Sequence, residues 1–259
     1  MLLMDHVSIS YRTKKEIVPV IQNLSLQIEQ GEALAILGPS GCGKSTLVNT
    51  LAGTLSPESG RIDYIKGNDR QPLNPKVHKI GMIPQNCGLL PWKTVQGNCL
   101  MPLKIRHEAI TGERKREIEK IYQSLDVAGL LERYPKQISG GQVQRVALAR
   151  AFILRPDLLL MDEPFSALDA MTRDEARKLF LRVWEQNRPT TVLVTHSIEE
   201  ALYLGNQVVV MGAHSGTIEY QMRNSYFGNL YPDSMEYLAV KQLLREKLKP
   251  CDRRRSELE

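Results

Sequence analysis

The feature that most constrains this chain is a glycine-rich loop that ends in a lysine and a serine. The loop consists of Gly38, Pro39, Ser40, Gly41, Cys42, Gly43, Lys44 and Ser45. It follows an apolar run at 33–37 that predicts a strand, and it opens a helical pattern at 44–51. This is the context that the phosphate-binding pattern G-x-x-x-x-G-K-[ST] requires. The glycines let backbone N–H groups surround phosphate oxygens, and the helix start adds its positive end.

The side chains at the end of the loop fit a nucleotide and its metal ion. Lys44 would reach the β- and γ-phosphates, Ser45 would ligate Mg²⁺, and Thr46 would hydrogen-bond a phosphate. The alternative is an ordinary glycine-rich turn, but the strand before the loop and the helix after it favour phosphate binding.

Other short apolar runs predict buried parallel strands between helices. They lie at 79–83, 158–161, 191–195 and 207–211, and a helical pattern covers 171–185. Strands that alternate with helices predict a doubly wound α/β core. The alternation of polar and apolar residues from Met4 to Ile28 instead predicts antiparallel strands at one edge.

The middle of the chain has a different pattern. Strand signals stop between Val95 and Leu154, and helical signals dominate there, notably at 111–125. We therefore expect one domain over 1–259, with an α/β core at about 1–94 and 155–230. A helical subdomain is expected at about 95–154 and a C-terminal helix at about 231–250.

Two further segments carry groups suited to phosphate chemistry. The apolar run at 158–161 ends in Asp162, which suits a Mg²⁺-binding acid, and Glu163, which is placed to act as general base toward water. A second segment holds Ser139, Gly140, Gly141 and Gln142, with a helical pattern after it. Ser139 can cap that helix, and the glycines leave N–H groups open to an anion. Acidic strand ends and Ser-Gly-Gly turns are also common in purely structural roles.

Together these motifs resemble the nucleotide-binding subunits of ATP-binding cassette (ABC) transporters over nearly the whole chain. The family's signature sequence, Leu-Ser-Gly-Gly-Gln, has Ile138 at its first position here. The resemblance implies a P-loop NTPase core with an antiparallel β edge subdomain and an inserted helical subdomain. It also implies that the chain hydrolyses ATP with Mg²⁺.

The resemblance assigns roles to more residues. Asp169 matches the family's D-loop, His196 its switch histidine, and Gln85 the glutamine that contacts Mg²⁺. Tyr11 resembles the aromatic residue that stacks on adenine. A histidine at a strand end and an aromatic residue on an edge strand are also common as structural residues.

The resemblance implies a mechanism that needs two cassettes, and we expect the two to be identical subunits of a homodimer. They face head to tail, and each ATP lies between the phosphate loop of one subunit and Ser139 to Gln142 of the other. Hydrolysis then uses Lys44 and Mg²⁺ for charge neutralisation, Glu163 for water activation and His196 for sensing the γ-phosphate.

The chain has one phosphate loop and one signature, with a short helical region between them, and lacks the Asn-Lys-x-Asp guanine motif. These features exclude a tandem cassette, a chromosome-maintenance ATPase with a long coiled coil, and a small GTPase. A transporter subunit and a soluble assembly ATPase of the iron–sulfur type remain. The segment from Gly88 to Val95 resembles importer ATPases for nitrate, sulfonates and taurine, in which it contacts the membrane subunit. Internal packing of its leucines and Trp92 is the alternative.

Composition and charge bear on the location and partners. The net charge is +5, with acidic and basic residues mixed along the chain, so we expect no nucleic-acid partner. No apolar run is long enough to span a bilayer, and the start lacks a signal-peptide pattern. We expect a cytoplasmic protein, peripheral on the inner face of the cell membrane. Its expected partners are membrane-spanning permease subunits, a separate substrate-binding protein and a second cassette.

Overall fold

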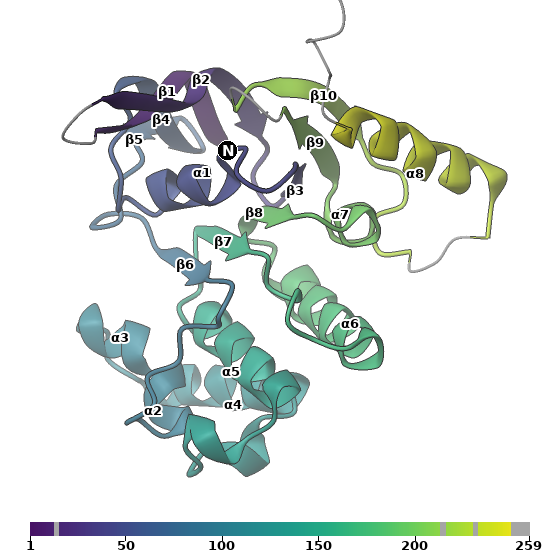
Figure 1. Ribbon diagram of the computed structural model, residues 1–259. Helices are drawn as coiled ribbons and strands as arrows, with labels where there is room; N and C mark the ends of the chain where they lie inside the picture. Colours follow the sequence, from purple (N-terminus) through teal and green to yellow (C-terminus); the bar gives the residue numbers. More distant parts are fainter. Residues whose placement is uncertain (13–15, 213–215, 230–232, 250–259) are drawn as a thin grey trace, which may run out of the picture. The chain divides into compact units, whose positions relative to one another are not determined.

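The computed structural model describes residues 1–12, 16–212, 216–229 and 233–249. The chain forms two compact units, one made of Met1–Leu73 with Val192–Glu259 and the other of Asn74–Thr191. Figure 1 shows the strands and helices of both units. Among the described residues, no helix combines the length and the apolar character that crossing a membrane requires.

The first unit contains an antiparallel sheet. Its strands are β1 (Leu2–Arg12), β2 (Ile17–Ile28), β4 (Ser59–Lys66) and β5 (Asp69–Pro72), in the order β2-β1-β4-β5. β1 pairs antiparallel with both β2 and β4. The antiparallel edge predicted from the first residues is therefore confirmed, whereas β4 and β5 were not predicted.

The same unit contains strands of a second, mainly parallel sheet. They are β3 (Ala33–Leu37), β8 (Thr190–Thr195), β9 (Gln207–Met211) and β10 (Ile218–Arg223), in the order β10-β9-β3-β8. β3 pairs parallel with β9, and β10 pairs antiparallel with β9. Every residue of β3, β8 and β9 is buried, which explains why these strands are nearly continuous apolar runs.

Helices of the first unit are α1 (Lys44–Leu51), α7 (Ile198–Leu204) and α8 (Met235–Leu248). The predicted helix at 44–51 is confirmed with the same bounds. α8 packs against α7 and β9, and Figure 1 shows α8 beside α7. The predicted C-terminal helix is confirmed from Met235 onward, while residues 231, 232 and 250 of that prediction lie outside the described residues.

The second unit contains two parallel strands, β6 (Ile80–Ile83) and β7 (Leu158–Asp162). Their register pairs Ile83 with Met161. Both strands were predicted to within one residue. Because the strands are parallel, the segments that follow them leave the same edge of the sheet.

The remainder of the second unit is helical. Its α-helices are α2 (Val95–Cys99), α3 (Met101–Ile105), α4 (Gly112–Ser124), α5 (Gly140–Ile153) and α6 (Ala170–Asn187). Short 3₁₀ helices lie at Ala128–Leu130 and Pro135–Gln137. The absence of strands from 95–154, a range that the structure describes completely, agrees with the sequence pattern. The boundaries of an inserted subdomain stay a prediction.

Aromatic packing joins α5 to α6. The ring of Phe180 lies 5.8 Å from that of Phe152 and 6.4 Å from that of Phe165, centroid to centroid. All three side chains are fully buried. Phe180 is therefore at the centre of the contact between the two helices.

Phe180→Ala should lower the free energy of unfolding by about 3–5 kcal/mol, because it removes a fully buried ring and leaves a cavity. Urea unfolding measures the change. Met171→Ala on the same helix is the control, since Met171 is 80% exposed, and its effect should stay within about 0.5 kcal/mol. Equal effects of the two substitutions would contradict this account of the core.

Candidate functional site

The phosphate loop joins β3 to α1 in the first unit. Gly41 and Gly43 have φ angles of 83° and 102°, a region that favours glycine. A Cβ atom on Gly43 would lie 3.0 Å from Val20 Cγ1, and one on Gly38 would lie 2.5 Å from Cys42 Sγ. Gly43 is the N-cap of α1 and supplies no side-chain hydrogen bond to the first turn. The N–H groups of that turn are therefore suited to an anion.

Lys44 is held inside this loop. Its side chain is buried, and Nζ donates hydrogen bonds to Gly38 O at 2.7 Å and Pro39 O at 2.9 Å. An ammonium group has three N–H donors, so a third remains for a phosphate oxygen. Ser40 and Ser45 are exposed at the loop. This donor set fits the phosphates of a nucleotide.

Tyr11 lies next to the start of α1. Its hydroxyl is 3.3 Å from Thr46 Oγ1, and its side chain is 42% exposed. Thr46 itself is buried. The structure therefore brings Tyr11 to the phosphate loop and leaves part of its ring open to a ligand.

Burial raises the pKa of the Cys42 thiol in the phosphate loop, which consequently stays protonated at neutral pH.

In the second unit, Gln85 and Glu163 come together. Each stands two residues beyond the paired residues Ile83 and Met161, so the parallel register brings them to the same edge. Gln85 Nε2 donates to Glu163 Oε2 at 3.4 Å. Asp162, the last residue of β7, and Glu163 are both half-buried. Glu163 has a φ of 46°, a conformation that is uncommon for a residue with a side chain and is found often at functional sites.

Ser139 caps α5, as predicted from the sequence. Gln142 N donates to Ser139 Oγ at 3.3 Å, and Ser139 N donates to Gln142 Oε1 at 3.0 Å. The side chain of Gln142 therefore completes a capping box. A Cβ on Gly140 would meet no atom within 4 Å, whereas a Cβ on Gly141 would lie 2.5 Å from Thr172 Cγ2 on α6. Close packing of α5 on α6 thus gives Gly141 a structural role that the sequence did not reveal.

The two remaining predicted residues stand at helix starts. Asp169 is exposed and caps α6, accepting a hydrogen bond from Thr172 N at 3.1 Å. Hydrogen bonding to Thr172 holds the pKa of Asp169 below its ordinary value, which keeps the carboxylate charged. His196 lies between β8 and Ser197, the N-cap of α7, and its side chain is exposed.

Arg150 is a buried charged residue that sequence reasoning missed. Its guanidinium donates to Gly88 O at 2.6 Å and to Cys87 O. Cys87 and Gly88 have φ angles of 60° and 55°. Cys87 Sγ also donates to Gln144 Oε1 at 2.8 Å. Arg150 and Gln144 both belong to α5, so this helix holds the segment just after Gln85. An arginine among the buried apolar residues of α5 was the available sequence signal.

Asn98 holds the next part of the same segment. It is fully buried, and its amide bonds to both backbone groups of Leu90 and to the carbonyls of Lys93 and Thr94, at 2.7–3.1 Å. Trp92 lies between these bonded residues, and its side chain is 70% exposed. The loop around Trp92 is therefore fixed from inside while the indole faces outward.

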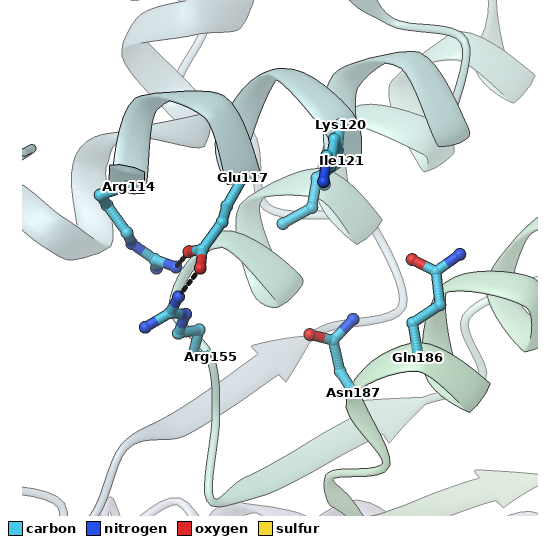
Figure 2. A pocket seen from close by; sticks show the side chains of 7 residues that line it. All are labelled: Arg114, Glu117, Lys120, Ile121, Arg155, Gln186 and Asn187. Carbon is cyan, nitrogen blue, oxygen red and sulfur yellow. Dashed lines mark hydrogen bonds and ion pairs between the residues drawn. The ribbon is translucent and has the colours of Figure 1, made fainter. Parts of the chain in front are cut away.

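A cavity in the second unit contains none of the predicted site residues. It has a volume of about 230 Å³ and is lined by Arg114, Glu117, Lys120, Ile121, Arg155, Gln186 and Asn187. Figure 2 shows both guanidinium groups directed at Glu117. The hydrogen bond from Arg114 has the largest effect on the pKa of Glu117 and, together with the one from Arg155, holds it below its ordinary value. The two arginines are thus already paired with a carboxylate in this cavity.

Comparison with known proteins places the phosphate loop and the acidic strand end within one family model. The model, described as ABC transporter, matches residues 21–166. An aliphatic sulfonates import ATP-binding protein, SsuB, from Bacillus cereus is 38% identical over 250 residues, which cover 96% of this chain and 95% of that protein. A nitrate import ATP-binding protein, NrtD, from Synechococcus elongatus is 39% identical over 210 residues, which cover 80% and 74%.

Solved structures give the same result for the fold. The ATP-binding cassette MJ0796, in a dimeric post-hydrolysis state bound to ADP and Pi, is 31% identical with a TM-score of 0.73. The match covers 86% of this chain and 98% of that chain. The predicted α/β fold of the P-loop NTPase type is thereby confirmed.

Arg150→Lys should expose the thiol of Cys87, because a single ammonium nitrogen cannot reproduce the planar fork in which two guanidinium nitrogens each bond one carbonyl. The alkylation rate of Cys87, followed by peptide mass spectrometry, should rise. Cys99, whose pKa is raised to about 12 by burial, should stay protected as an internal reference. Each lost bond should lower the free energy of unfolding by about 1.5–3 kcal/mol.

The control for Arg150 is Arg145→Lys on the same helix. Arg145 pairs with the exposed carboxylates of Asp126 and Glu175, and such pairs contribute at most about 1 kcal/mol. Equal protection of Cys87 in both variants would show that Arg150 does not hold the segment.

Proposed function

This chain belongs to the ABC transporter family and hydrolyses ATP with Mg²⁺ as cofactor, and we propose that it powers the import of a small nutrient through membrane-spanning partners. The proposed nutrient is of the nitrate, sulfonate or taurine type. The import proteins for sulfonates and nitrate described above support this assignment by their similarity over most of the chain.

In this proposal the phosphate loop binds the triphosphate of ATP. Lys44 donates to the β- and γ-phosphates, and the backbone N–H groups of the loop bind the remaining oxygens. Ser45, Gln85 and Asp162 would hold Mg²⁺, which supplies positive charge against the phosphates. Carboxylate, hydroxyl and amide oxygens are the ligand types that this cation prefers. Tyr11 stacks on the adenine ring.

Glu163 acts as the general base. Its carboxylate accepts a proton from the attacking water, and the donor Gln85 Nε2 orients that carboxylate. His196 senses the γ-phosphate. Lys44 stabilises the negative charge of the transferred phosphoryl group, so the catalysis rests on positioning and electrostatics.

The proposed working form is a head-to-tail homodimer. Ser139, Gly140, Gly141 and Gln142 of one subunit contact the ATP held by the phosphate loop of the other, and Asp169 lies at the same interface. The capping box at Ser139 leaves the exposed Gly140 at the helix start, where N–H groups suit an anion. The dimeric MJ0796 cassette supports this arrangement.

The observation that carries the transporter assignment is the exposed Trp92. A side chain of this size that is 70% exposed on a loop fixed by Asn98 is an unusual use of tryptophan in a single chain. Tryptophan is among the commonest anchors of protein interfaces. Leu89 and Leu90 beside it are half-buried. We propose that this segment binds a permease subunit, with Gln85 nearby in the chain to link the contact to hydrolysis.

The proposal sets the location and the partners. The chain lies on the cytoplasmic face of the cell membrane, bound to permease subunits that work with a separate substrate-binding protein, and it does not bind nucleic acid. A soluble assembly ATPase, such as one in iron–sulfur cluster biogenesis, is the second candidate. The two candidates differ in whether Trp92 contacts a membrane protein.

Glu163→Gln should keep ATP binding and lower turnover by about 10²–10⁴-fold, because an amide cannot take a proton from water. It should also promote an ATP-bound dimer, seen by size-exclusion chromatography. Lys44→Ala is the contrasting variant and should weaken nucleotide binding itself. Near-normal hydrolysis by Glu163→Gln in the assembled complex would place the general base elsewhere.

Trp92→Ala should weaken binding to the permease by at least about 2 kcal/mol, or about 30-fold, because it removes an interface anchor. The measurements are recovery of membrane subunits in a pull-down and nucleotide affinity of the isolated variant. Val77→Ala is the control, since Val77 is also exposed but lies outside the segment. Lost nucleotide binding would assign Trp92 to the core, and unchanged assembly and uptake of sulfonate, taurine or nitrate would show that Trp92 does not mediate the permease contact. Failure of the unsubstituted chain to recover any membrane subunit would favour the soluble candidate.

A further inference from the structure

The C-terminal helix α8 is tied to the start of α7. Lys241 Nζ on α8 lies 2.6 Å from Glu199 Oε1, and both side chains are largely shielded from solvent, at 18% and 33% exposure. Tyr237 of α8 packs edge-on against Tyr226, with ring centroids 5.1 Å apart. Figure 1 shows α8 running beside the short α7. The ion pair therefore connects two elements that also pack on each other.

Glu199 belongs to a hydrogen-bond network around the start of α7. Ser197 Oγ lies 3.4 Å from Glu199 Oε2 and accepts a bond from Glu200 N at 3.2 Å. Thr195 Oγ1 donates to Glu200 Oε2 at 2.7 Å and accepts from Ser197 N at 3.1 Å. Thr195 and Ser197 are the two neighbours of His196 in the chain. The network consequently fixes the backbone on both sides of that histidine.

The carboxylate of Glu199 is ionised at neutral pH. Partial burial of Glu199 opposes ionisation, but the hydrogen bond from Lys241 and the positive charge of that lysine outweigh burial, so the net pKa of Glu199 is below its ordinary value. A permanent charge pair at the first turn of α7 holds that turn more firmly than the single Ser197 cap could.

We propose that Lys241 and Glu199 are positioning residues for His196, so that α8 sets the orientation of this histidine during hydrolysis. The inference rests on the proposed γ-phosphate role of His196. Neither residue touches ATP in this proposal. Lys241 acts on Glu199, Glu199 acts on the Ser197 cap, and the cap fixes the backbone from which the imidazole projects.

Lys241→Met in the full-length chain should leave the affinity for ATP unchanged and lower kcat by about tenfold, since a small displacement of a catalytic side chain costs that much or more. Glu199→Gln should have the same effect, and Lys241→Arg, which keeps the charge, should restore kcat. Lys247→Met on the same helix removes an equal charge that lies over Tyr220 rather than beside Glu199, and it should leave kcat unchanged.

The decisive measurement repeats Lys241→Met in a His196→Ala background. If Lys241 acts through His196, the second substitution lowers kcat no further. A further tenfold loss there, or an equal loss in Lys247→Met, would overturn the proposal. Full activity of His196→Ala alone would instead overturn the proposed role of His196, so the two failures are distinguishable.

A readout without turnover keeps the test independent of activity. The imidazole ¹H–¹³C NMR signals of His196, assigned from His196→Ala, should shift in Lys241→Met and Glu199→Gln but not in Lys247→Met. Unchanged His196 signals in the first two variants would show that the ion pair stabilises α8 without positioning the histidine.

Discussion

The phosphate-binding geometry depends on a backbone turn that side chains would prevent. Gly41 and Gly43 take positive φ angles, and the space beside Gly43 is already filled by Val20. The buried strand β3 fixes one end of this turn and α1 fixes the other. Lys44 can then fold back onto the loop carbonyls with its charge inside the loop. The anion site is thus built mainly from backbone groups and is formed before a ligand arrives.

The sequence was most informative where a fully buried strand ends in a polar group. β3 is entirely apolar and β9 is apolar after Gln207, and the bounds of both could be predicted to the residue. The parallel register of β6 and β7 brings Gln85 to Glu163, a proximity that depends on the pairing of the two strands and was not predicted from the motifs. β5 could not be predicted, because all of its residues are exposed and only its pairing with β4 makes it a strand.

Side chains that bond distant backbone carbonyls were beyond sequence reasoning. Arg150 and Asn98 carry no motif, and their importance lies in the Cys87, Gly88 and Leu90 backbone groups that they satisfy. A buried polar side chain without such partners is costly, so its partners determine its meaning. Those carbonyls can be identified only in the folded structure.

The hydrogen bonds from Arg150 to the carbonyls of Cys87 and Gly88 tie α5 to the segment after Gln85. The N-terminal end of α5 is the signature segment at Ser139, and Arg150 lies eleven residues further along, about 16 Å by helical rise. A tilt of roughly five degrees about one end therefore moves the other by about 1.4 Å. Because Arg150 bonds both carbonyls, a displacement of this end of α5 would act directly on the backbone before Trp92. The displacement produced by a given tilt is set by the length of helix between Ser139 and Arg150, which can change in evolution only by whole residues.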